Sequence, residues 1–259
     1  MAFGGGSPVW LVENPLTGAP SEYKHVSFDP RQVPVFNGRS QQLSFHGNGL
    51  ELFNMVTSMK DFYDDEEVKA VYHDEVGSIL KRVTGCSQVL IFDHTRRTTS
   101  ADIQAARLTR TPAVWVHGDY TSDSALQRLN NLLPEEAAAI CKRRFCIVNV
   151  WRSICGTVEQ KPMVFLRNSS LAASRGHVKA VERVSRHEGR SSFIQFVSYA
   201  PEHHWVAFPS MKFHEAVAFK TFDSLDPDGA ILHASADTPC TSKSAAPRES
   251  MEVRALCVW

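Results

Sequence analysis

Hydrophobic residues follow two different periods along the chain, and the change between them divides it. Between Asp64 and Arg82, apolar side chains recur at three- and four-residue steps, which is the period of an amphipathic helix. Acidic residues open this segment, which suits the positive end of a helix dipole. Gly85 follows the last apolar position and predicts the end of the helix.

After Gly85 the pattern changes to short runs of β-branched and aromatic residues bounded by turn-forming residues. One helical interruption, Ser122–Leu133 with a second short helix starting at Pro134, lies among these runs. Many strands with helices concentrated early predict a mainly β fold with flanking helices, an antiparallel sandwich or barrel. The predicted strands are Gln88–Asp93, Ala113–Val116, Phe145–Trp151, Ser192–Tyr199, His204–Phe208, Ala216–Phe222, Ala230–Leu232 and Glu249–Val258.

The first 45 residues differ from the rest, because they are rich in Pro, Gly and Ser and show little periodicity. We expect residues 1–45 to form an extended N-terminal arm. Residues 46–259 are expected to form one domain that begins with helices, since all-β units of about 200–250 residues are common. The glycines at positions 4–6 follow no strand, and no dinucleotide or P-loop spacing occurs, so we assign them no phosphate-binding role.

Composition narrows the classes of partner. The chain has 28 Lys+Arg and 28 Asp+Glu, so it lacks the basic excess of nucleic-acid-binding proteins. No apolar run approaches the ~18 residues that span a bilayer, and the start of the chain lacks the features of a secretory signal. We therefore expect a cytoplasmic protein that binds a small molecule and neither nucleic acid nor membrane.

Cysteine spacing and the last residue bear on cofactors and assembly. The six cysteines form no C-x-x-C pair and no paired zinc spacing, which argues against a disulfide framework or a zinc ribbon. Trp259 follows the last predicted strand directly. We expect this end of the chain to pack either against a second copy or against the N-terminal arm. A homodimer therefore stays open.

The segment His117-Gly118-Asp119 has the geometry of a metal-binding pair. Side chains two apart on a strand point the same way, whereas on a helix they diverge. His117 and Asp119 follow an apolar predicted strand, and Gly118 leaves room between them. His73 and Glu75 also lie two apart, but they fall inside the predicted helix. The alternative for Asp119 is that it caps the following helix.

His233 is the third candidate ligand, because it follows a strand and a turn and starts a loop. Two histidines and one carboxylate on one face of iron leave three open coordination positions, as an oxygenase requires for dioxygen and a cosubstrate. A lone loop histidine is more often structural. The weight of this candidate therefore depends on its spacing to the C-terminal strand.

Arg248 and Ser250 start that strand, fifteen residues after His233, and strand alternation places both on one face. A guanidinium can hold a carboxylate through two hydrogen bonds, and a neighbouring hydroxyl can add another. This pairing suits the distal carboxylate of 2-oxoglutarate, whose α-keto acid end would bind the metal. Arg254 shares their parity and is either a pocket residue or a surface ion-pair partner. A barrel-edge ion pair is also the alternative for Arg248.

Several blocks together resemble a family of hydroxylase/desaturases from fungal and bacterial secondary metabolism, which includes gibberellin desaturase-like proteins and the hydroxylating component of cephamycin methoxylation. The resemblance extends from about residue 45 to the C-terminus. Its blocks are Thr84-Gly-Cys with Phe92-Asp93-His94-Thr95, His117-Gly-Asp119-Tyr-Thr121, Asn149-Val-Trp151-Arg152, Phe208-Pro-x-Met211, Phe219-Lys220, His233 and Pro247-Arg248-Glu-Ser250-x-Glu252-Val-Arg254.

The resemblance implies a double-stranded β-helix core, a cupin-like jelly roll, that uses non-haem Fe(II), 2-oxoglutarate and dioxygen to hydroxylate or desaturate small metabolites. It makes His117, Asp119 and His233 the iron ligands and Arg248 with Ser250 the 2-oxoglutarate anchor. Three further arginines are candidates for binding a substrate carboxylate or lining its channel: Arg128, Arg152 and Arg254. Ser153, His214 and the short segment after His233 depart from the family pattern and leave the substrate open.

Two other functions remain in view at this stage. The same three ligands could serve an iron oxygenase that takes its electrons from the substrate and does not use 2-oxoglutarate. A β-barrel that binds a metabolite without catalysis is the other alternative. Neither accounts for Arg248 and Ser250 as directly as a 2-oxoglutarate-dependent oxygenase does.

Overall fold

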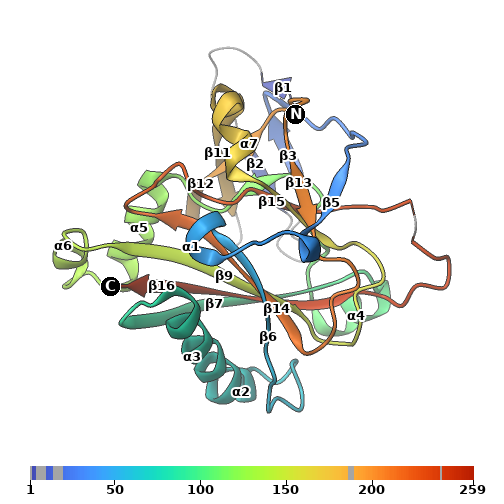
Figure 1. Cartoon of the computed structure of the whole chain (residues 1–259), viewed down its shortest axis with the longest axis horizontal. Coiled ribbons are helices and arrows are strands. Elements are labelled where there is room, and N and C mark those ends of the chain that lie inside the picture. The colour runs from blue at the N-terminus through green and yellow to red at the C-terminus, as the bar shows by residue number, and fades with distance from the viewer. Residues whose placement is uncertain (1, 4–9, 14–19, 186–189, 240) are drawn as a thin grey trace.

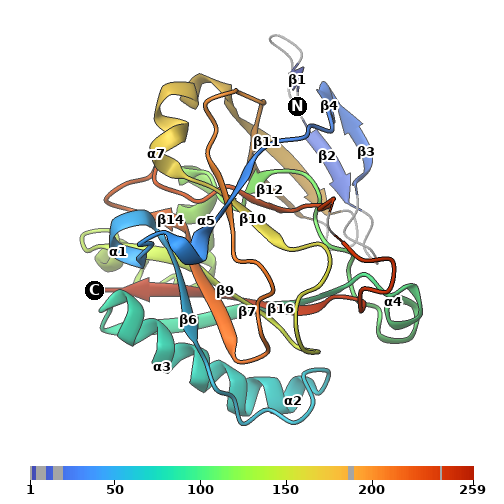
Figure 2. The same cartoon turned by 45° about the vertical axis from the view of Figure 1, so that its right-hand side comes forward.

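The computed structural model describes the chain except for residues 1, 4–9, 14–19, 186–189 and 240. Two large β-sheets make up its centre, and helices cover the outer face of the smaller sheet (Figure 1). Turning the molecule by 45° shows α2 and α3 running together below that sheet (Figure 2). A cluster of buried side chains, including Trp151, Phe165 and Phe219, joins the two sheets. The predicted mainly β fold with flanking helices is confirmed.

The five-stranded sheet is antiparallel throughout. Its order is β6 (Leu50–Asn54), β14 (Glu215–Asp223), β9 (Phe145–Ser153), β16 (Glu249–Val258) and β7 (Gln88–Thr98). The order of the nine-stranded sheet is β3 (Pro20–Lys24), β2 (Trp10–Glu13), β11 (Val178–Ser185), β12 (Arg190–Val197), β8 (His117–Gly118), β15 (His233–Ser235), β10 (Met163–Leu166), β13 (Trp205–Ala207) and β5 (Val35–Asn37). A small separate sheet pairs β1 (Ala2–Phe3) with β4 (Val26–Ser27).

Most of the helices are short. The α-helices are α1 (Phe45–Asn48), α2 (Asp65–Glu67), α3 (His73–Thr84), α4 (Ala101–Arg107), α5 (Ser122–Leu132), α6 (Ala137–Ile140) and α7 (Asn168–Leu171). The 3-10 helices are η1 (Gly38–Ser40) and η3 (Ala172–His177), and η2 (Val68–Tyr72) is a π-helical segment. None of the helices in the described part of the chain is both long and apolar enough to cross a membrane.

The predicted long helix is confirmed as the continuous run α2, η2 and α3. Asp64 caps its start, since the carboxylate accepts hydrogen bonds from the backbone N–H groups of Glu66 and Glu67. Gly85 ends it in the left-handed conformation, at φ 70°, which glycine adopts at little cost. Val76 and Leu80 from this run are fully buried against the outer face of the five-stranded sheet.

Two predicted strands are wrong in position. Ala113–Val116 and Ala230–Leu232 are not strands, and in each case the strand starts directly afterwards, at His117 and at His233. Both observed strands are very short, so no period-two pattern marks them in the sequence. The strands β10 and β11 were not predicted, although each is well paired.

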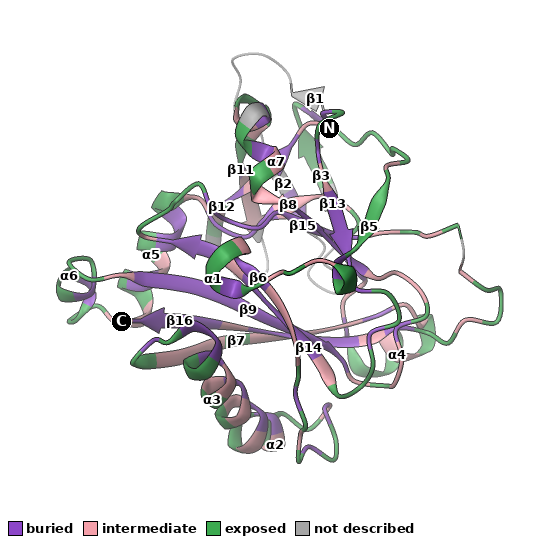
Figure 3. Ribbon diagram, viewed as in Figure 1, coloured by how far each residue is buried: buried purple, intermediate pink, exposed green. Residues whose placement is uncertain are grey.

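The two faces of β16 divide the molecule into an outer core and an inner site. Met251, Val253 and Cys257 point outward and pack with the helix α3. The even-numbered residues between them, including Glu252 and Arg254, point inward toward the nine-stranded sheet. The strands β9 and β16 are mostly buried (Figure 3). Inner-face residues of β16 are therefore the ones placed to take part in a site.

The first 45 residues contribute strands to the nine-stranded sheet in the part that is described. There β2 pairs with β11, and β5 pairs with β13, both in parallel. The boundary of an arm at residue 45 stays a prediction. The glycines at positions 4–6 lie outside the described residues.

Candidate metal and cosubstrate site

His117 and His233 lie directly opposite each other on paired strands. They are register partners between β8 and β15, and their ring centroids are 4.5 Å apart. Opposite residues on neighbouring strands project from the same face, so the pairing itself brings the two imidazoles together. One ligand atom from each, with one carboxylate oxygen of Asp119, lies within 4.8 Å of the others. The structure thus gathers all three predicted metal ligands.

Hydrogen bonds orient both imidazoles toward this cluster. Nδ1 of His117 lies 3.0 Å from the carbonyl oxygen of Trp115, and Nδ1 of His233 lies 3.1 Å from that of Ile231. A carbonyl oxygen only accepts, so each Nδ1 carries the proton and donates it. Each Nε2 then keeps its lone pair and is the available metal ligand, an arrangement common for ligating histidines.

Burial and charge keep these groups in the protonation states that a metal requires. Burial, followed by the nearby charge of His233, lowers the pKa of His117 to about 3, so its ring is neutral at physiological pH. Burial alone would raise the pKa of the Asp119 carboxyl, but the charge of Arg254 and the hydrogen bond from Asn149 lower it below its ordinary value. A neutral imidazole and an ionised carboxylate are the ligand forms that bind a metal.

Arg248 lies in the same cavity as the two histidines, which is also lined by Trp151 and Met163. Its Nη1 donates to the carbonyl oxygen of Lys161 at 2.5 Å and lies 3.2 Å from Oγ of Ser235. Its Nε is buried and has no hydrogen-bond partner among the described residues. Burial, and then the charge of Arg97, lowers the pKa of Arg248 to about 9. A carboxylate bound in this cavity would accept a hydrogen bond from Nε of Arg248 and offset the repulsion between Arg248 and Arg97.

Two further residues of this cavity escaped the sequence reasoning, Arg97 on β7 and Glu252 on β16. The sequence contained a signal for Glu252, because strand alternation places it on the same face as Arg248 and Ser250. Arg97 is the register partner of Ser250 on the neighbouring strand, a pairing that one sequence does not reveal. Ser250 itself is buried, and its hydroxyl donates to the carbonyl oxygen of Arg97 at 3.4 Å.

Arg152, predicted to contact substrate, faces away from this cavity. It alternates with Asn149 and Trp151 on β9 and therefore points to the outer face, where it is fully buried. Its guanidinium lies over the ring of Phe213, 4.7 Å from the centroid, and donates to the carbonyl oxygens of Phe213 and Met55. This placement argues against a contact between Arg152 and a substrate in the cavity.

The other two candidate substrate arginines also lie outside this cavity. Arg128 on α5 is half-buried, with its guanidinium 5.4 Å from the centroid of the Phe92 ring. Arg254 lies among carboxylates: Nη1 is 2.7 Å from Asp93, and Nη2 is 2.5 Å from Glu252. Neither arginine lines the cavity that holds Arg248.

Aromatic rings continue from the cluster toward the surface. The Trp115 ring centroid lies 6.4 Å from that of His117, and Phe28 lies 6.3 Å from Trp115. Tyr23 lies 5.5 Å from Phe28, and both are exposed. Phe196, the register partner of His117 on β12, closes the group at 6.2 Å from Phe28. One side of the cluster thus opens onto an apolar, aromatic surface.

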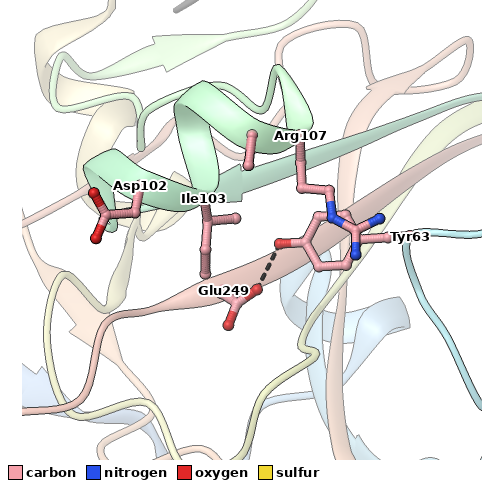
Figure 4. Close-up of a pocket in the computed structure, with 6 residues that line it drawn as sticks. Tyr63, Asp102, Ile103, Arg107 and Glu249 are labelled. Atoms are coloured by element: carbon pink, nitrogen blue, oxygen red, sulfur yellow. Dashed lines mark hydrogen bonds between the residues drawn. The ribbon is translucent and has the colours of Figure 1, made fainter.

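A second cavity, of about 350 Å³, lies on the outer side of β16, beneath α4 (Figure 4). Its polar groups pair with one another: the Tyr63 hydroxyl donates to the Glu249 carboxylate at 2.5 Å, and the Arg107 guanidinium lies over the Tyr63 ring. Ile103 supplies an apolar wall. Unlike the inner cavity, this one offers no cluster of metal-ligand atoms.

Known proteins match both the sequence and the fold. The family model for an oxidoreductase/YMDC permease-like domain matches residues 4–258. Among curated relatives, the alpha-ketoglutarate-dependent dioxygenase phiK of a fungal species is 28% identical over 247 residues, covering 92% of this chain and 87% of the relative. The hydroxylase/desaturase efuI of Hormonema carpetanum is 28% identical, covering 93% and 90%.

Solved structures give the same fold. The iron and alpha-ketoglutarate-dependent endoperoxidase NvfI superposes with a TM-score of 0.83 at 21% identity, covering 98% of this chain and 92% of that chain. This match confirms the predicted jelly-roll core. The relatives confirm the predicted resemblance to 2-oxoglutarate-dependent oxygenases, and with it the expectation of an iron-dependent oxidoreductase acting on a small molecule. The chain belongs to the oxidoreductase/YMDC permease-like domain family.

Proposed function

We propose that this chain is an Fe(II)- and 2-oxoglutarate-dependent oxygenase that oxidises a C–H bond of an apolar small molecule. His117, Asp119 and His233 would hold the iron, and Arg248 would hold the distal carboxylate of 2-oxoglutarate. One observation carries the proposal: the buried Arg248, whose Nε lacks a partner among the described residues, lines the same cavity as both histidines.

The donor set fits iron. Two neutral imidazole nitrogens and one carboxylate oxygen are the facial set that leaves room for cosubstrate and dioxygen on non-haem Fe(II). In each histidine, the hydrogen bond from Nδ1 to a backbone carbonyl directs Nε2 toward the cluster. The Asn149 amide donates to the far oxygen of the Asp119 carboxylate at 2.7 Å. Such outer contacts fix ligand orientation before the metal arrives.

The charge of the cavity also suits a bound carboxylate. Arg248 is almost completely buried, and no carboxylate forms an ion pair with it within the described ranges of the chain. A buried guanidinium without a paired carboxylate is costly, and a bound carboxylate would offset that cost. Trp151, whose ring centroid lies 5.4 Å from the guanidinium carbon, restricts the side chain to one orientation. Ser250 is the second predicted anchor, on the same face of β16.

When bound, iron and 2-oxoglutarate supply the oxidising chemistry, with dioxygen as the oxidant and succinate and carbon dioxide as the coproducts. The chain supplies position. Arg248 would fix one end of the cosubstrate, and the buried walls of the cavity would exclude water. Phe28 and the partly exposed Trp115 would contact the apolar surface of the substrate, because aromatic rings bury large apolar areas, and the buried Phe196 would support them from behind.

Anaerobic titration with Fe(II) and 2-oxoglutarate tests the proposal. The chelate should give a weak visible charge-transfer band in the wild type, and His117→Ala should lose it together with iron binding. His46→Ala is the matched control, because His46 is exposed on α1 and is not part of the cluster. Iron binding without the band would favour an oxygenase that does not use 2-oxoglutarate. Failure of the wild type to bind iron would overturn the metal site.

A further inference from the structure

The Asp119 carboxylate is held asymmetrically. Its Oδ1 faces the cluster, 3.7 Å from Nε2 of His117. Its Oδ2 faces the other way, where Nδ2 of Asn149 donates to it at 2.7 Å and Nε of Arg254 lies 3.6 Å away. The Asn149 amide thus hydrogen-bonds to the rear oxygen, the Arg254 guanidinium forms an ion pair with it, and the front oxygen is directed at the candidate metal position.

Arg254 reaches this place through the register of three neighbouring strands. It is the cross-strand partner of Asp93 on β7 and of Asn149 on β9. The three side chains form a row across the inner face of the five-stranded sheet. Asn149 is in turn the partner of Phe219 on β14, and the Phe219 ring lies 4.7 Å from that of His233. This row therefore contacts Asp119 through Arg254 and Asn149, and it contacts His233 through Phe219.

A β-bulge follows Arg254 directly. The register between β16 and β7 shifts between Arg254 and Ala255, so one extra residue, Phe92, lies on β7 at this point. Bulges twist a strand locally and redirect the side chains beside them. Here the bulge lies directly beside Arg254, so it affects the direction of the side chain that contacts Asp119.

Each nitrogen of the Arg254 guanidinium lies next to an oxygen of the chain. Nη1 donates to Asp93 and lies 3.3 Å from Oγ1 of Thr95, Nη2 donates to Glu252, and Nε faces Asp119. The group is held by atoms of the chain, so it has little capacity left for a substrate carboxylate. This occupancy argues against the predicted contact between Arg254 and a substrate.

The charges around Arg254 also favour a dication in front of Asp119. One guanidinium lies among three carboxylates, those of Asp93, Glu252 and Asp119. Glu252 and Asp119 are both buried, where unneutralised negative charge is unfavourable. A divalent ion at Oδ1 would neutralise the remaining charge of this group.

We propose that Arg254 is a positioning residue for the metal: it fixes the rear oxygen of Asp119 so that the carboxylate binds through Oδ1 alone. Asp93 and Glu252 hold Arg254 in place, and Asn149 supports the same oxygen. A one-oxygen ligand preserves the three open positions that cosubstrate and dioxygen need. This inference rests on the proposed metal site at His117, Asp119 and His233.

Cobalt(II) titration of the whole chain tests this role without turnover, because cobalt absorption bands report both affinity and coordination number. Arg254→Met should weaken Co(II) binding by about 10- to 100-fold, the usual loss when an outer contact of a metal ligand is removed. It should also shift the bands, since the freed Asp119 can bind through both oxygens. Arg254→Lys keeps the charge but lacks the planar guanidinium, so its Co(II) affinity should lie between those of the wild type and Arg254→Met.

Arg152→Met is the matched control, because it removes another buried arginine from the same sheet on the opposite face. It should bind Co(II) like the wild type. Wild-type affinity and bands in Arg254→Met would overturn the positioning role. If Arg254→Met does not fold, Arg254→Lys decides, and unchanged affinity and bands there would overturn it as well. A wild type that binds no Co(II) would instead remove the metal site itself, and the inference with it.

Discussion

Two buried arginines, Arg248 directly before β16 and Arg254 in the middle of that strand, differ in what surrounds them. Arg248 has backbone carbonyl and hydroxyl partners, a neighbouring arginine and a buried Nε without a described partner. Arg254 is enclosed by Asp93, Glu252 and Asp119. Burial and the Arg97 charge lower the pKa of Arg248, whereas at Arg254 the three carboxylates outweigh burial and raise it.

The difference separates a binding group from a positioning group. A buried cation that forms no ion pair with a described carboxylate is available to an anion from solution. A buried cation that the chain surrounds with carboxylates acts on those carboxylates instead. Strand parity makes the two arginines equivalent in the sequence, and only their neighbours on β7, β8 and β9 distinguish them.

Replacing Arg248 should have the largest effect on the cosubstrate. Arg248→Met removes the group proposed to bind the distal carboxylate, so the dissociation constant of 2-oxoglutarate should rise by at least about 30-fold, or about 2 kcal/mol. Calorimetric titration of 2-oxoglutarate into the Mn(II)-loaded protein without oxygen measures it. Arg248→Lys keeps the charge but not the two-point geometry, and we expect it to recover part of the affinity.

The distinction between the two arginines would fail if Arg248 did not affect 2-oxoglutarate binding or if Arg254 affected it without affecting metal binding. Arg248→Met that binds 2-oxoglutarate normally would leave the cavity without a cosubstrate role. An Arg254→Met protein that loses 2-oxoglutarate but keeps Co(II) binding would return Arg254 to the group of substrate or cosubstrate contacts.

Long alternating strands were predictable from the sequence, and short ones were not. The predicted starts of the strands at Phe145 and Glu249 agree with β9 and β16, because nine or ten residues of apolar pattern leave little ambiguity. The strands β8 and β15 contain two and three residues, too few for any period to show. Their existence depends on pairing between distant segments, and this pairing is what brings His117 opposite His233.

The site divides in the same way. Parity along one strand places Arg248 and Ser250 on one face, because it is a local property of the backbone. It could not tell which face of β9 was the inner one, so Arg152 was taken as a pocket residue while its neighbour Trp151 lines the cavity. Asn149 received no role from the sequence, because its contact with Asp119 joins two segments that lie thirty positions apart.

Arg152→Met sharpens the comparison with a third arginine, and its effect should be on stability alone. The guanidinium donates to the backbone carbonyls of Met55 and Phe213 in a fully buried position, and the substitution leaves these acceptors without a donor. We expect a loss of about 1–3 kcal/mol in the free energy of unfolding, measured by urea denaturation. The affinity for 2-oxoglutarate should be unchanged. A large loss of that affinity in the folded variant would show that the two faces of β9 are coupled.

The smallest effect is expected at the outer cavity, where Tyr63→Phe removes the hydroxyl that donates to Glu249. The free energy of unfolding should fall by about 1 kcal/mol at neutral pH. Burial and the hydrogen bond to Glu249 raise the pKa of Tyr63, so its contribution is present below the ordinary tyrosine pKa of about 10 and declines above it. Urea denaturation of wild type and variant from pH 8 to about pH 11 should show the difference between them shrinking at the alkaline end. Metal and 2-oxoglutarate affinities should stay at wild-type values, because Glu249 and Arg248 point to opposite faces of β16. A change in either affinity would mean that the outer cavity communicates with the site through that strand.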